Sequence, residues 1–118
     1  MDLSKEKCVP CEGGVAPLAR GEAEAMLGES RLVGWSLDAG VKHISRQFEF
    51  KDFKQALGFV NQVGAVAEAE GHHPDIHLTD YCRVTITLST HAIGGLSHND
   101  FIVAIKINNL TLFSNSRE

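Results

Sequence analysis

The stretch DFKQALGFVNQVGAVAEAEGHHP, residues 52–74, carries the strongest helical pattern in the chain and decides how the rest is organised. Its apolar residues recur at helical spacing and form a stripe wide enough to lie on a sheet. These residues are Phe53, Ala56, Leu57, Val60, Val63, Gly64 and Ala67. Gly71 stands where a left-handed residue ends a helix, and Pro74 follows where a helix cannot continue. We therefore expect a helix over residues 52–70, with a histidine pair just past its end.

Alternating apolar and polar residues predict strands on both sides of this helix. Residues 82–90 alternate most clearly and place Val84, Ile86 and Leu88 on one face. Residues 33–37 and 44–50 also alternate around a turn at residues 38–40, which predicts an antiparallel hairpin. In the first strand of this hairpin, the apolar residues expected to share a face are Val33, Trp35 and Leu37. A short strand is expected around residues 76–78.

The remaining elements complete an α+β pattern. Residues 1–17 contain turn formers without periodicity and predict an irregular arm, so that residues 18–118 form a single domain. Leu18–Leu27 predicts a first short helix that ends at Gly28. Ser97–Asp100 resembles a capping box, with Asp replacing the usual Glu or Gln, and predicts a final helix after it. This order of elements predicts an antiparallel four-stranded sheet with three helices packed on one face.

Composition restricts the classes of protein to consider. The 118 residues are 43% hydrophobic and 22% charged, which is ordinary for one globular domain. The formal net charge of −4 gives no basic patch for phosphate backbones, so nucleic acid is not an expected partner. We see no signal peptide and no apolar run of about 18 residues, so we expect a cytoplasmic protein without a membrane span. Three cysteines, an odd number, predict reduced thiols.

Histidines are the clearest candidates for chemistry. The chain has six, and four of them flank one strand region: His72, His73, His77 and His91. An imidazole with a reference pKa of about 6.5 can both donate and accept protons near neutral pH. Glu68 lies on the last helical turn, where its carboxylate can accept a hydrogen bond from an imidazole. His91 is expected at the end of the strand over residues 82–90, on its polar face.

These positions match a family signature. Glu68, His72-His73-Pro74, Tyr81, His91 and Asp100 stand at spacings that resemble those of the pterin-4a-carbinolamine dehydratases. The flanking residues agree as well, in Gly34-Trp35, Phe48-Glu49-Phe50, Thr90-His91 and Gly94-Gly95-Leu96. The resemblance covers about residues 18–113 and is specific, because several polar positions must coincide.

The resemblance implies the dehydration of 4a-hydroxytetrahydropterin to the quinonoid dihydropterin, in tetrahydrobiopterin recycling, without metal or redox cofactor. Hydroxide leaves carbon 4a poorly unless it is protonated, and nitrogen 5 loses a proton, so one acid and one base are needed. By the resemblance, His72 and His91 are the proton-transfer pair, and His73 assists catalysis by holding the pterin. Glu68 and Asp100 complete the substrate-binding signature.

The resemblance also raises questions of partners and specificity. Gly71 and Ile76 replace an acidic residue and a Trp found in the animal form, so the preferred pterin can differ from biopterin. An aromatic amino-acid hydroxylase is a candidate pathway partner. Exposed sheet edges predict a homo-oligomer, either a dimer or a tetramer.

Two other functions stay open at this point. A metal protein could use His72, His77, His91 and the cysteines, although Cys8-x-x-Cys11 lacks the second cysteine pair that a structural zinc site usually needs. An interaction module is the second alternative, because some animal relatives are dimerisation cofactors for a transcription factor. Asp100 can also be only a helix N-terminal charge, worth about 0.3–1 kcal/mol.

Overall fold

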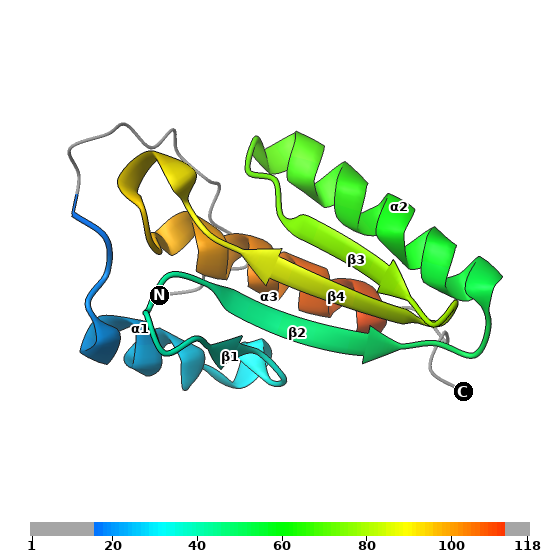
Figure 1. Cartoon of the computed structure of the whole chain (residues 1–118), viewed down its shortest axis with the longest axis horizontal. Coiled ribbons are helices and arrows are strands. Elements are labelled where there is room, and N and C mark those ends of the chain that lie inside the picture. The colour runs from blue at the N-terminus through cyan, green and yellow to red at the C-terminus, as the bar shows by residue number, and fades with distance from the viewer. Residues whose placement is uncertain (1–15, 113–118) are drawn as a thin grey trace.

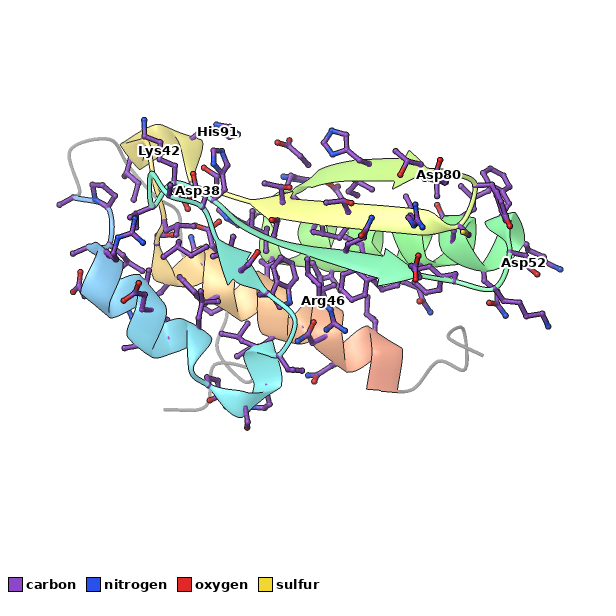
Figure 2. The ribbon with its side chains drawn as sticks, turned by 60° about the horizontal axis from the view of Figure 1, so that its bottom comes forward. Asp38, Lys42, Arg46, Asp52, Asp80 and His91 are labelled. Atoms are coloured by element: carbon purple, nitrogen blue, oxygen red, sulfur yellow. The ribbon has the colours of Figure 1, made fainter. Side chains whose placement is uncertain are left out.

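A four-stranded antiparallel sheet organises residues 16–112, the part of the chain that this computed structural model describes. The strands are β1 (Ser36–Leu37), β2 (Ile44–Glu49), β3 (Asp75–Thr79) and β4 (Arg83–Leu88), in the spatial order β1-β2-β4-β3. The helices are α1 (Arg20–Leu27), α2 (Phe53–Glu70) and α3 (His98–Leu112), with short 3-10 turns at η2 (Ser30–Leu32) and η3 (His91–Ile93). Figures 1 and 2 show the helices on one face of the sheet. The predicted fold class is therefore confirmed, whereas the predicted arm lies mostly outside the described residues.

Helix α2 begins and ends at the signals present in its sequence. The Asp52 side chain accepts a hydrogen bond from the Gln55 amide at 2.8 Å, which caps the first turn. Gly71 has a φ of 67°, in the left-handed region that glycine adopts without steric cost, and ends the helix. The buried face consists of Ala56, Phe59, Val63 and Ala67. Phe53 and Leu57, predicted for the same stripe, are instead 50% and 43% exposed.

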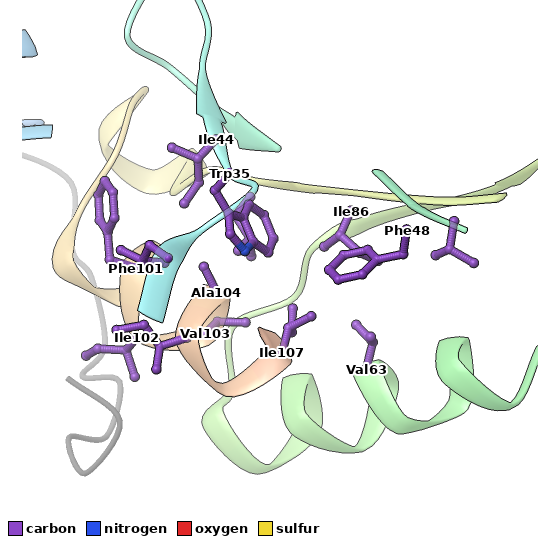
Figure 3. Close-up of a cluster of buried hydrophobic side chains, with 14 of the residues drawn as sticks. Trp35, Ile44, Phe48, Val63, Ile86, Phe101, Ile102, Val103, Ala104 and Ile107 are labelled. Carbon is purple, nitrogen blue, oxygen red and sulfur yellow. The ribbon is translucent and has the colours of Figure 1, made fainter. Parts of the chain in front are cut away.

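The core lies between the sheet and the helices (Figure 3). Ile44, Phe48, Val84, Ile86 and Leu88 supply the sheet's buried face, and α3 is buried along most of its length. Burying a side chain of this size stabilises the fold by roughly 1.5–3 kcal/mol relative to exposure. The helices are therefore fixed firmly against one face of the sheet. None of the helices within residues 16–112 is long and apolar enough to cross a membrane.

The first strand is shorter than its sequence predicts. Val33 is 70% exposed instead of sharing a buried face with Trp35. The chain turns at Gly34, whose φ is 92°, and the Arg46 side chain lies so close that a Cβ at this glycine would be 2.5 Å from Nε. The Arg46 guanidinium also donates to the Val33 carbonyl at 3.0 Å. This tertiary contact interrupts the alternation, so only two residues of β1 pair with β2.

The strand register brings three chain segments to one end of the sheet. Ile44 of β2 is opposite Leu88 of β4, and Asp75 of β3 is opposite Thr87. The residues that precede β2 and β3 therefore lie beside those that follow β4. Figure 2 shows the residues labelled at this end, Asp38, Lys42 and His91, and those at the opposite end, Asp52 and Asp80.

Candidate active site

A buried carboxylate and a partly buried imidazole form the centre of the site. His72 follows the end of α2, and its Nε2 lies 2.6 Å from Asp100 Oδ1 in the first turn of α3. The Asp100 side chain is completely buried and that of His72 is 12% exposed. Because an ionised carboxylate only accepts hydrogen bonds, we assign the shared proton to His72 Nε2, which leaves Nδ1 as the second proton site of the ring.

Asp100 is fixed by its place at the start of α3. Its Oδ2 accepts hydrogen bonds from the Ser97 amide at 3.0 Å and from the Thr90 hydroxyl at 2.8 Å. The Ser97 hydroxyl accepts from the Asn99 amide at 3.2 Å. The bond from the Ser97 amide to Asp100 is the one that the predicted capping box requires, with Asp in the position usually held by Glu or Gln, and the Ser97 hydroxyl caps the helix through the Asn99 amide. Asp100 therefore caps a helix with one oxygen and orients His72 with the other.

His73 has a carboxylate partner of its own, in a much more exposed setting. Its Nε2 lies 2.6 Å from Glu68 Oε2, and the two side chains are 60% and 78% exposed. Glu68 thus accepts from an imidazole, as expected, and the imidazole is that of His73. Solvent screening makes an exposed pair of this kind weak in stability terms, so its main effect is to restrict the orientation of the ring.

His91 lies in a tight loop instead of at the end of a strand. β4 ends at Leu88, and η3 begins at His91. Thr90 turns the chain back and pairs with Gly95, its amide donating to the Gly95 carbonyl at 2.8 Å. Gly94, with a φ of 68°, ends the intervening turn. The His91 carbonyl accepts from the Gly94 amide at 3.1 Å, but its exposed ring makes no hydrogen bond or ion pair within residues 16–112, so the ring is available to a ligand.

The neighbouring β1–β2 turn is held together by Asp38. Its Oδ1 accepts hydrogen bonds from the amides of Lys42 at 2.7 Å and His43 at 2.8 Å. Partial burial acts to raise the pKa of Asp38, but these amides and the His43 ring outweigh it and lower the pKa below its usual range. The turn lies against the His91 loop, because a Cβ on Gly95 would be 3.7 Å from the Val41 carbonyl oxygen.

Some sequence candidates do not join this arrangement. His77 is exposed on β3, and no group of three or more His, Cys, Asp or Glu side chains within residues 16–112 is placed to hold a metal ion. The structure therefore does not bring His72, His77 and His91, the histidines of the metal alternative, together as ligands of one ion. Cys8 and Cys11 lie outside the described residues. Sequence reasoning also missed Thr90, whose hydroxyl contacts Asp100. The adjacent Thr90-His91 match was a signal, but it did not reveal this contact.

The arrangement suits proton transfer to a small molecule. One imidazole has a buried carboxylate behind it, a second is oriented by an exposed carboxylate, and a third is presented on a short loop. A carboxylate hydrogen-bonded to an imidazole holds the ring in one tautomer and stabilises its protonated form. Such groups can act as general acids and bases without a covalent nucleophile.

Comparison with known proteins relates this chain to one family. The model for pterin 4 alpha carbinolamine dehydratase matches residues 16–110. A Halorhodospira halophila protein named "Putative pterin-4-alpha-carbinolamine dehydratase" is 50% identical over 110 residues, which cover 93% of this chain and 98% of that protein. The Arabidopsis thaliana protein "Pterin-4-alpha-carbinolamine dehydratase 2, mitochondrial" is 43% identical over 92% of this chain and 59% of its own length.

A solved structure agrees with these sequence matches. The crystal structure of a transcriptional coactivator/pterin dehydratase from Brucella melitensis superposes with a TM-score of 0.72 at 37% identity, covering 80% of this chain and 97% of that one. The sequence matches and the fold therefore indicate the same family over most of the chain. The chain belongs to the pterin-4a-carbinolamine dehydratase family.

Proposed function

We propose that this chain dehydrates 4a-hydroxytetrahydropterin to the quinonoid dihydropterin, with histidines as general acid and base. The observation that carries the proposal is the pair of the partly buried His72 and the buried Asp100, 2.6 Å apart, at the same end of the sheet as the loop that presents His91. Membership of the dehydratase family supports the same reaction.

The two proton transfers are assigned by the surroundings of each ring. The Asp100 carboxylate stabilises the imidazolium that forms when His72 accepts a proton, so His72 is the proposed base for nitrogen 5. His91 is the proposed acid that protonates the hydroxyl as it leaves carbon 4a, because its exposed ring can approach the substrate. His73, oriented by Glu68, is the proposed contact to the pterin ring.

The test is a stopped-flow absorbance assay on freshly generated 4a-hydroxytetrahydropterin near neutral pH. The intact protein should accelerate dehydration, and His72→Ala and His91→Ala should each lose about 10²–10⁴ of that acceleration, the usual contribution of a positioned acid or base. His77→Ala is the matched control, because His77 is an exposed histidine of β3 outside the signature. No acceleration by the intact protein, or an equal loss in the control, would contradict the proposal.

The proposal extends to a cytoplasmic homo-oligomer that recycles the product of an aromatic amino-acid hydroxylase. Support for self-association is the edge strand β3, which pairs only with β4 within the described part of the chain. Light scattering should then give the mass of a dimer or a tetramer. A monomeric mass at assay concentration would remove the oligomer while leaving the reaction untouched.

A further inference from the structure

Thr90 is the residue before His91, and its side chain contacts Asp100, the partner of His72. It follows β4 and directly precedes His91, and it is only 3% exposed. A threonine so deeply buried must satisfy its hydroxyl within the protein, because an unpaired buried polar group is costly. The partners of this hydroxyl show what the residue does.

The hydroxyl belongs to a directed chain of hydrogen bonds. Thr90 Oγ1 lies 2.8 Å from Asp100 Oδ2 and 2.8 Å from Ser97 Oγ. A hydroxyl has one proton to donate, and an ionised carboxylate has none, so Thr90 donates to Asp100 and Ser97 donates to Thr90. The proton order is therefore Ser97 to Thr90 to Asp100, and the chain ends on the carboxylate that contacts His72.

The backbone of the same residue holds the His91 loop. The Thr90 amide donates to the Gly95 carbonyl at 2.8 Å, and its carbonyl accepts from the Ile93 amide at 3.2 Å. These bonds join Thr90, which precedes His91, to Ile93 and Gly95, which follow it, and so close the loop that carries His91. Substitution of the Thr90 side chain leaves them in place, so the role of the hydroxyl can be tested separately from loop closure.

We infer that Thr90 is a positioning residue that links the two proton-transfer histidines, and this inference rests on the proposed function. Its hydroxyl fixes the rotation of the Asp100 carboxylate and through it the ring of His72. Its backbone fixes the turn that presents His91. Because Thr90 is only 3% exposed, it acts through these groups.

The experiment compares Thr90→Val, which keeps the shape but loses the hydroxyl, with Thr90→Ser, which keeps the hydroxyl. In Thr90→Val, kcat should fall by about 10-fold to 100-fold with KM unchanged, because a misoriented catalytic group costs up to about 10² in rate. Thr90→Ser should retain the kcat of the unmodified protein. A fall of kcat in Thr90→Ser as large as that in Thr90→Val would overturn the inference, because keeping the hydroxyl would then not preserve the rate.

A spectroscopic measurement separates this inference from the proposed reaction. The His72 Nε2 proton, held 2.6 Å from Asp100, should give a downfield proton resonance that His72→Ala removes. The resonance should persist in Thr90→Ser and broaden or shift upfield in Thr90→Val. If the intact protein does not accelerate dehydration but the resonance responds in this way, the positioning stands and the proposed function fails. If the protein is active and Thr90→Val changes neither kcat nor the resonance, the positioning is wrong.

Folding of the variants is checked by circular dichroism. If Thr90→Val does not fold, Thr90→Ala takes its place, because it also lacks the hydroxyl and leaves room for the surrounding side chains to adjust. The unmodified protein and Thr90→Ser should then have the same kcat, and Thr90→Ala should have a lower one. A Thr90→Ala variant as active as Thr90→Ser would overturn the inference.

Discussion

Gly95 has no room for a side chain, and replacing it with Ala provides a quantitative test of the packing around the His91 loop. An ideal Cβ at Gly95 would lie 2.7 Å from Pro17 Cβ and 3.3 Å from Pro17 Cγ. Carbon atoms prefer separations of about 3.5–4.0 Å, so the closest contact is too short by roughly 1 Å. The proline cannot easily move away, because its ring is stiff and the Leu18 amide donates to the Leu96 carbonyl at 2.9 Å. We expect Gly95→Ala to reduce the free energy of unfolding by about 1–3 kcal/mol, the usual cost of overpacking.

The second substitution, Pro17→Gly, removes both of the clashing atoms. By itself it should cost about 0.4–1 kcal/mol, because glycine increases the conformational freedom of the unfolded chain. In combination with Gly95→Ala it should recover most of the overpacking cost, giving a favourable coupling energy of about 1–2 kcal/mol in a double-mutant cycle. Urea unfolding followed by circular dichroism measures all four proteins.

Gly94→Ala is the matched control, since it makes the same substitution at the neighbouring residue for a different physical reason. A Cβ at Gly94 would meet nothing within 4 Å, but its φ of 68° strains any residue with a side chain. The expected cost of about 1–2 kcal/mol should not be relieved by Pro17→Gly. Strict additivity of Pro17→Gly and Gly95→Ala would refute the argument that Pro17 is what requires a glycine at this position.

Two further predictions concern charged groups. The Lys106 ammonium lies 2.7 Å from Glu70, whose side chain is 4% exposed. Lys106→Met removes this cation and should lower the free energy of unfolding, measured in urea, by about 2 kcal/mol. Adding Glu70→Gln should recover part of that loss. Because the pKa of Asp38 is lowered in the folded protein, its stabilising effect is present above the unfolded-state pKa of about 3.9 and is lost as pH falls through the lower native value. Asp38→Asn should therefore reduce the free energy of unfolding by about 0.5–1 kcal/mol near neutral pH, after allowance for solvent exposure, and make no difference in strong acid. A difference in unfolding free energy that does not change with pH would contradict this linkage.

Elements defined by local signals could be predicted from the sequence. Helix α2 shows this best, because Asp52 caps its own chain three residues on and Gly71 ends the helix by its backbone conformation. The predicted cap at Ser97 and Asp100 is local as well, and the structure confirms that Asp100 accepts from the Ser97 amide while the Ser97 hydroxyl accepts from the Asn99 amide. The sheet followed because β4 alternates without interruption over the residues that pair with both neighbours.

Features that depend on distant contacts could not be predicted. The exposure of Val33 results from the Arg46 side chain, which covers Gly34 from a different strand. The alternation of residues 82–90 continues to Thr90, yet β4 ends early because Thr90 pairs with Gly95 instead. Within the site, sequence spacing suggested a carboxylate near an imidazole, but only the folded chain shows that Glu68 pairs with His73. The catalytic roles of the histidines stay predictions.

Under the proposed function, the local order of the first turn of α3 and catalytic turnover depend on the same residue, Asp100. Asp100 closes the first turn of the helix with one oxygen and holds the His72 ring with the other. Fraying of that turn would release the imidazole even while the sheet remained intact. Local opening of a helix end costs less free energy than global unfolding. Heat inactivation should therefore precede melting, and engineering for a more durable catalyst should begin at this helix end, not in the hydrophobic core.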